Sequence, residues 1–156
     1  MSGRIHELLS RDHERLDRVL SLDEQDYAAF RSGLLRHIGI EERLLFPAIR
    51  AHHGDLLLLR QLHRDHAALS ALLVPPPTAV EIDQIRSVLA AHNPLEENSG
   101  GLYDLVDQLS ADAAAALTGA IEAFPVIPTA PHSDTPLLRT TIAQLLREAE
   151  EGRRRL

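Results

Sequence analysis

Residues 34–49 read Leu-Leu-Arg-His-Ile-Gly-Ile-Glu-Glu-Arg-Leu-Leu-Phe-Pro-Ala-Ile, and this stretch decides the fold class. Its apolar residues recur at the spacing of one helix face, at Leu34, Ile38, Leu45 and Ile49. His37 and Glu41 are four residues apart, and side chains with this spacing lie on one face of a helix. Because Leu34 precedes His37 by one helical turn, the imidazole falls on the apolar side. The stretch therefore predicts a helix that buries a histidine and carries a glutamate next to it.

The composition of the whole chain favours helix. Aromatic residues make up 3% of the 156 residues, tryptophan is absent, and Leu, Ala, Arg and Glu are abundant. Unbranched side chains keep their rotamer freedom in a helix, so this bias favours helix over strand. We predict an all-α fold, an antiparallel four-helix bundle with an additional C-terminal helix.

The apolar pattern also predicts where the helices lie. The expected ranges are about 3–22, 25–51, 55–73, from 80 past 92, 110–124 and 137–153. Gly54 and Pro75-Pro76-Pro77 separate the second, third and fourth helices. We expect residues 1–124 to form the bundle and residues 125–156 to form a proline-rich segment and a helix that packs on it. The last two helices are expected to pack rather than to take part in chemistry.

Several classes of protein are disfavoured by composition. The chain has no cysteine, which excludes disulfides, thiolate catalysis and cysteine-ligated zinc. Its formal net charge of −7 disfavours a nucleic-acid partner. No apolar run approaches the ~20 residues of a membrane span, and the first residues lack a hydrophobic signal segment. A cytoplasmic protein without a membrane partner is expected, and the sequence leaves its oligomeric state open.

A pattern of polar residues occurs twice along the chain. Arg11-Asp12-His13 in the first predicted helix matches Arg64-Asp65-His66 in the third. His37-x-x-x-Glu41-Glu42 in the second helix matches His92-x-x-x-Glu96-Glu97 in the fourth. Each histidine lies on the apolar side of its helix, and a buried ionisable group is costly unless it is paired or ligates a metal. The doubled pattern therefore predicts a metal site that the four helices share.

Each part of this pattern has a simpler explanation when it is taken alone. A lone histidine such as His13 is usually a core residue with one hydrogen bond, and Glu42 and Glu97 can be solvated. Asn93-Pro94-x-Glu96 also fits the start of a helix, with Asn93 as N-cap. None of these alternatives accounts for the joint occurrence of both motifs. We therefore expect a metal site built from His13, His37, Glu41, His66, His92 and Glu96.

The donor atoms indicate which metal is bound. Imidazole and carboxylate without thiolate suit iron, manganese or zinc. Six donors are too many for one tetrahedral zinc ion, whereas two metals bridged by carboxylates fit the number of donors. The donors therefore predict two metal ions bridged by carboxylates and leave iron, manganese and zinc open.

These motifs resemble the hemerythrin family, in particular bacterial hemerythrin-like (HHE cation-binding) domains with an H–HxxxE–H–HxxxE arrangement. Residues 41–47 also resemble the EExxLFP stretch of that family, and the resemblance covers about residues 4–107. It implies two iron ions bridged by carboxylate or by an oxo or hydroxo group, with manganese and zinc as weaker candidates. The protein would then be a non-heme di-iron protein that binds or reacts with dioxygen, peroxide or nitric oxide, and catalase-like activity is one such reaction. The alternatives are a metal-dependent iron- or oxygen-sensing module without turnover and a metal-free structural bundle.

Two further residues are candidates near the site. Oxygen-carrying hemerythrins place two histidines four apart on the third helix, whereas His63 and His66 are three apart, so the resemblance does not imply oxygen carriage. Superposing the repeat places His66 on His13 and His63 on Ser10. His66 is thus the expected ligand, and His63 is either a fifth histidine ligand or a group that flanks the site. Tyr103 would reach the site if the fourth helix continued through the two glycines before it.

Overall fold

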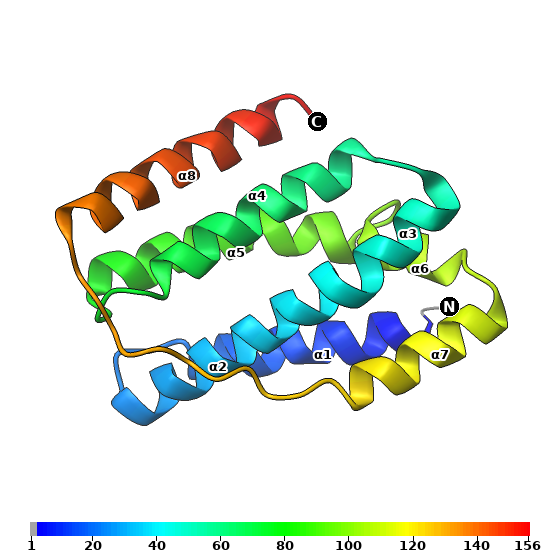
Figure 1. Cartoon of the computed structure of the whole chain (residues 1–156), viewed down its shortest axis with the longest axis horizontal. Helices are drawn as coiled ribbons and strands as arrows, with labels where there is room; N and C mark the ends of the chain where they lie inside the picture. The colour runs from blue at the N-terminus through cyan, green and yellow to red at the C-terminus, as the bar shows by residue number, and fades with distance from the viewer. Residues whose placement is uncertain (1–2) are drawn as a thin grey trace.

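The computed structural model describes residues 3–156, and all regular secondary structure in this range is helical (Figure 1). The elements are α1 (Arg4–Val19), α2 (Glu24–Ile40), a π-helical turn η1 (Glu41–Leu45), α3 (Phe46–His53), α4 (Leu57–Leu72), α5 (Ala79–Glu97), α6 (Leu102–Asp107), α7 (Ala111–Glu122) and α8 (Pro136–Arg154). The predicted all-α class is confirmed for these residues. Residues 1 and 2 of the predicted bundle lie outside the described range. Within residues 3–156, no helix combines the length and the apolar character that a membrane span requires.

Several helix ends follow from local signals in the sequence. Gly54 ends α3 with a φ of 79°, a conformation that favours glycine. Thr78 begins α5 with a capping box, in which Glu81 accepts the Thr78 backbone N–H at 2.8 Å. Ser110 and Thr135 each accept a backbone N–H at the start of α7 and α8. The predicted starts of the last two helices are therefore confirmed.

The second predicted helix contains a π turn that the sequence did not predict. α2, η1 and α3 are continuous, and the backbone N–H of Phe46 bonds to the carbonyl of Glu41, five residues earlier. Pro47 follows at once, and a proline within a helix has no N–H and clashes with the carbonyl four residues before it. A wider turn lets the helix continue past this proline. The π turn includes Glu41, a predicted ligand.

Two apolar clusters fill the interior, one on each side of a polar layer. One cluster contains Leu16, Phe30, Leu69 and Ile85, and the other contains Leu9, Phe46, Leu62 and Tyr103. On α1, His13 therefore lies between a leucine of one cluster and a leucine of the other. His66 has the same position on α4. The predicted metal ligands thus interrupt an otherwise apolar core.

The chain after α7 runs along the outside of the bundle. Residues 123–135 pass α2 without regular structure, and α8 then lies along α4 (Figure 1). Arg36 holds the start of this segment by donating to the carbonyls of Ile121 at 2.9 Å and Phe124 at 3.0 Å. α8 lies tightly against α4 at Gly152, where an added Cβ would lie 2.1 Å from Gln61 Oε1.

Gly152→Ala is expected to lower the free energy of unfolding by about 1–2 kcal/mol. Alanine normally stabilises a helix interior relative to glycine by up to about 1 kcal/mol. Here the new methyl group would displace Gln61, which is fully buried and donates to Asp65 and to the carbonyl of Ala149. Chemical denaturation of both proteins in the same metal state measures the difference.

Gly119→Ala is the matched control, since nothing lies within 4 Å of a Cβ at this exposed position in α7. This variant should be more stable than the unchanged protein. Equal stabilisation by the two substitutions would contradict the close docking of α8 on α4.

Candidate metal centre

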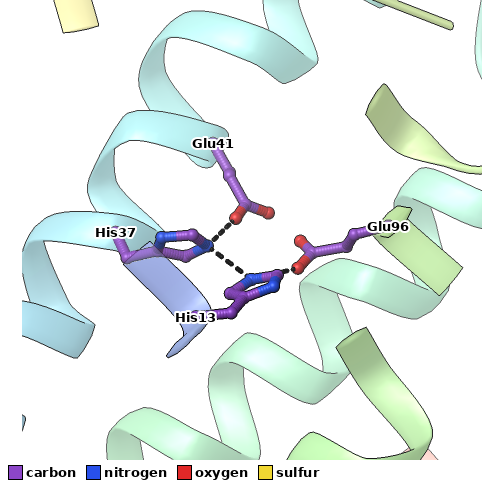
Figure 2. Close-up of side chains that lie close together, drawn as sticks. All are labelled: His13, His37, Glu41 and Glu96. Atoms are coloured by element: carbon purple, nitrogen blue, oxygen red, sulfur yellow. Dashed lines mark hydrogen bonds and ion pairs between the residues drawn. The ribbon is translucent and has the colours of Figure 1, made fainter. Parts of the chain in front are cut away.

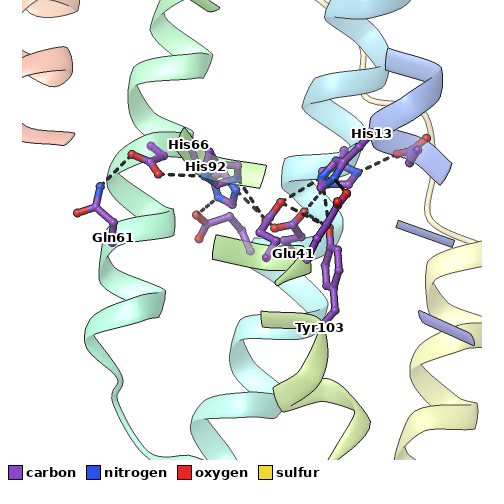
Figure 3. A network of polar contacts seen from close by, with 12 residues as sticks. His13, Glu41, Gln61, His66, His92 and Tyr103 are labelled. Atoms are coloured by element: carbon purple, nitrogen blue, oxygen red, sulfur yellow. Dashed lines mark hydrogen bonds and ion pairs between the residues drawn. The ribbon is translucent and has the colours of Figure 1, made fainter. Parts of the chain in front are cut away.

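The polar layer brings together all six predicted ligands from α1, α2, η1, α4 and α5 (Figures 2 and 3). They are His13, His37, Glu41, His66, His92 and Glu96. The two glutamate side chains are 0% exposed and the four imidazoles are 2–8% exposed. Sequence positions that lie far apart therefore form one buried cluster.

The six side chains form two groups that share both glutamates. His13 and His37 form one group with Glu41 and Glu96, and His66 and His92 form the other with the same two carboxylates. In each group, one donor atom per residue lies within 4.8 Å of the others. Such groups can hold a metal ion, and the shared glutamates place the two positions side by side.

Each shared carboxylate directs one oxygen to each position. Glu96 Oε1 is 3.1 Å from His13 Nε2, and Glu96 Oε2 is 3.3 Å from His92 Nε2. Glu41 Oε1 contacts His37 Nε2, and Glu41 Oε2 is 3.6 Å from the nearest imidazole nitrogen of His66. Both carboxylates can therefore bridge two ions.

A second ring of carboxylates orients the four imidazoles. The Nδ1 atoms lie 2.5 Å from Glu97 for His13, 2.9 Å from Asp12 for His37, 2.8 Å from Glu42 for His66 and 3.1 Å from Asp65 for His92. An ionised carboxylate only accepts hydrogen bonds, so each Nδ1 carries the proton. Every Nε2 then faces the cluster and can bind a metal once it has lost its own proton, which is the arrangement that metal-ligating histidines commonly have.

The internal repeat explains which carboxylate serves which histidine. The aspartate before the first histidine of each unit, Asp12 or Asp65, orients the second histidine of the same unit. The second glutamate of each motif, Glu42 or Glu97, orients the first histidine of the other unit. Sequence reasoning missed these four roles, although their signal was the Asp-His and Glu-Glu pairs that occur in both units. Glu42 and Glu97 are thus not merely solvated.

Unpartnered polar atoms show that the cluster fits a cation. Glu41 Oε2, His66 Nε2 and Glu96 Oε2 are buried and have no hydrogen-bond partner among residues 3–156. All three belong to the group that includes His92. Buried polar atoms without partners are rare because they lose their hydration. One metal ion at this position would satisfy all three.

The electrostatics of the cluster also favour the binding of a cation. Burial lowers the pKa of His37, but the Glu41 carboxylate, a hydrogen bond to Asp12 and the charge of Glu96 together raise this pKa well above its usual value. Burial likewise lowers the pKa of His92, yet Glu96 and a hydrogen bond to Asp65 raise it to about 10. Burial raises the pKa of Glu41, but His37 lowers it well below its usual value. The cluster therefore attracts positive charge, and a metal ion that binds here must displace protons.

Tyr103 also reaches the cluster, although the predicted route to it is wrong. α5 ends at Glu97, Gly100 has a φ of 79°, and a separate helix, α6, carries the tyrosine. Its Oη lies 3.3 Å from His13 Nε2 and 3.4 Å from Glu41 Oε1 (Figure 3). Burial and the nearby carboxylates raise the pKa of Tyr103 well above its usual value, so the phenol keeps its proton.

His63 does not join either group of ligands. Its side chain is 65% exposed, and its Nδ1 lies 2.9 Å from Glu42 Oε1, the same oxygen that orients His66. Of the two roles considered for His63, the structure shows the flanking position. The alternative role of Asn93 as a helix N-cap is wrong, because α5 runs unbroken from Ala79 to Glu97.

α8 contributes more than the packing role that the sequence predicted. Arg153 Nη1 donates to Asp65 Oδ1 at 2.5 Å, and Gln61 Nε2 donates to the same oxygen at 2.9 Å. The other oxygen of Asp65 holds His92. The equivalent Asp12 is paired with Arg15 of its own helix, whose side chain is 51% exposed. The two metal positions therefore differ in how firmly their outer carboxylates are held.

No protein-family model, curated protein or solved structure matches this chain.

Metal binding is expected to release protons and to become tighter as the pH rises. The pKa of His92 is about 10, so at neutral pH its proton competes with the metal, and this competition weakens as the pH approaches that value. Calorimetry in buffers with different ionisation enthalpies measures the proton release. Titrations at about pH 6 and about pH 8 measure the affinity. A constant or falling affinity over this interval would contradict the assignment of these imidazoles as ligands.

Arg153→Gln is expected to weaken metal binding at the His92 position by about 10–100-fold, the usual cost of losing a group that supports a ligand. Stepwise metal titration separates the two binding events. Arg15→Gln is the matched control at the equivalent position, and it should have a smaller effect because Arg15 lies at the surface. Equal losses in the two variants would show that α8 has no specific influence on the centre.

Proposed function

We propose that this chain is a hemerythrin-like, non-heme di-iron protein that binds or reacts with dioxygen, peroxide or nitric oxide. The observation that carries this proposal is the pair of ligand groups that share Glu41 and Glu96, with all four imidazole Nε2 atoms directed inward. Inward-facing glutamates and histidines on facing helices are a known way to build a two-metal site in a helical bundle. The donor set without thiolate also suits iron better than copper(I) or an iron–sulfur cluster.

We further propose that α1, the α2–η1–α3 segment, α4 and α5 form an antiparallel four-helix bundle, with α8 as an additional helix. α1 packs on the α2 segment and α4 packs on α5, and residues from these helices fill the same two apolar clusters. Short connections such as residues 20–23 and 54–56 favour antiparallel neighbours. This arrangement accounts for the convergence of ligands that are so distant in the sequence.

His13 and His37 would hold one ion and His66 and His92 the other, each pair together with Glu41 and Glu96. Bound iron would supply redox and Lewis-acid chemistry there. The outer carboxylates keep the imidazoles in the tautomer that can ligate, and the two apolar clusters limit access of water. Tyr103 holds a proton at Oη beside His13 and Glu41, where it can donate a hydrogen bond to a small ligand.

Metal analysis of the purified, iron-loaded protein tests the proposal directly. We expect about two iron ions per chain and an absorption spectrum in the near ultraviolet that chelation removes. Oxygen release on addition of peroxide would identify a catalase-like activity. One iron ion or none after iron-replete loading would refute the di-iron proposal.

His66→Ala is expected to abolish binding of two metals, because it removes a buried donor of the second group. His63→Ala should leave the metal content unchanged, because its exposed imidazole only contacts Glu42. The two variants differ by one turn on the same helix, so each is the control for the other. Retention of two metals in His66→Ala, together with their loss in His63→Ala, would reverse this assignment.

A sensing module without turnover is the second candidate, and the contact between α8 and the centre favours it. Arg153 of α8 donates to Asp65, and Asp65 also holds His92. Binding of a metal at His92 can therefore change the position of α8. Metal-dependent protection of α8 from proteolysis, without peroxide turnover, would support this alternative over an enzyme.

A further inference from the structure

An apolar pocket of about 390 Å³ lies beside the metal centre, between α1, α2, α4 and α5. Leucine side chains such as Leu16, Leu34 and Leu69 line it. The imidazoles of His13 and His37 also belong to its wall. His13 is the most exposed of the four imidazole ligands, at 8%. The pocket therefore borders the metal centre.

The residues that line the pocket on α1 and at its C-terminal end run from His13 to Leu20, which corresponds to roughly 10 Å at the rise of an α-helix. Arg86 of α5 lines the end near Leu20, because its Nη2 donates to the Leu20 carbonyl at 2.6 Å. One end of the pocket thus has metal ligands, the middle has aliphatic side chains and the other end has a guanidinium.

The charge of Arg86 has no direct partner in the described part of the chain. Among residues 3–156, its side-chain hydrogen bond goes to the Leu20 carbonyl, and no carboxylate forms an ion pair with it. Asp17 also lines the pocket but does not pair with Arg86. A guanidinium keeps its charge at all ordinary pH values and has several N–H donors in a fork that matches a carboxylate.

We propose that this pocket binds a medium-chain carboxylate, a straight-chain acid of about eight carbons, with its head on Arg86 and its alkyl chain directed toward His13. Pockets of about 300–1,000 Å³ hold small organic ligands, whereas dioxygen or nitric oxide would fill only a small part of this volume. The span of roughly 10 Å from His13 to Leu20 in the lining also matches an extended chain of about eight carbons. The inference deepens the proposed function and rests on it in one respect, that the alkyl end lies beside bound iron.

Calorimetric titration of the iron-loaded full chain with octanoate and with 1-octanol tests the proposal. The two probes have the same chain length and differ in charge, so octanoate should bind about tenfold more tightly. Arg86→Gln should lower the affinity for octanoate by about tenfold and leave the affinity for octanol unchanged. Arg18→Gln is the matched control, because this exposed arginine of α1 lies outside the pocket, and it should change neither affinity.

Leu89→Trp tests the pocket independently of Arg86. Leu89 lines the pocket, so a larger side chain there should weaken the binding of both probes. The circular dichroism spectrum and the iron content of the protein should stay unchanged. The proposal is overturned if octanol or octylammonium binds as tightly as octanoate, or if Arg86→Gln and Leu89→Trp leave octanoate binding intact.

Iron content, measured on the same samples, separates this proposal from the di-iron function. Octanoate binding to a protein that takes up no iron would support the pocket and refute the di-iron centre. Two bound iron ions without octanoate binding would refute the pocket proposal alone.

Discussion

The burial of four imidazoles and two carboxylates in the middle of the core is the constraint on which the rest of this structure depends. An ionisable group in an apolar interior is costly unless it is paired, hydrogen-bonded or bound to a metal. Here Glu41 and Glu96 are fully buried, and apolar clusters lie on both sides of them. Contacts among the six groups, and hydrogen bonds from the imidazoles to a further ring of carboxylates, offset this cost.

That outer ring also ties the two halves of the chain together. Asp12 and Asp65 hold histidines within their own halves, whereas Glu42 and Glu97 each hold a histidine of the other half. Neither half can orient its own imidazoles completely. The two repeat units therefore depend on each other to orient their histidines. α8 makes the two units unequal, because Arg153 donates a hydrogen bond to only one of the two aspartates, Asp65.

The sequence predicted the helices and the six side chains that meet in the buried cluster, because both depend on local spacing. Residues four apart, such as His37 and Glu41, share a helix face in any helical fold, and the second copy at His92 and Glu96 repeats the signal. The π turn at Glu41 was harder to predict, because Pro47 could equally have ended or kinked the helix. Tyr103 reaches the cluster because α6 begins anew after Gly101, and no local pattern indicates the direction of that helix.

By itself, the sequence determined the helical class, the six inner donors and their equivalence in two units, since these follow from periodicity and residue type. Only the tertiary structure decided which carboxylate holds which imidazole, that His63 stays outside the cluster, and that Arg153 reaches Asp65. The packing of the helices also forms the pocket that His13 and Arg86 line. The reason is geometric: periodicity determines which face of a helix is buried, but a contact between two helices depends on their relative position and rotation, which arise only when all the helices pack together.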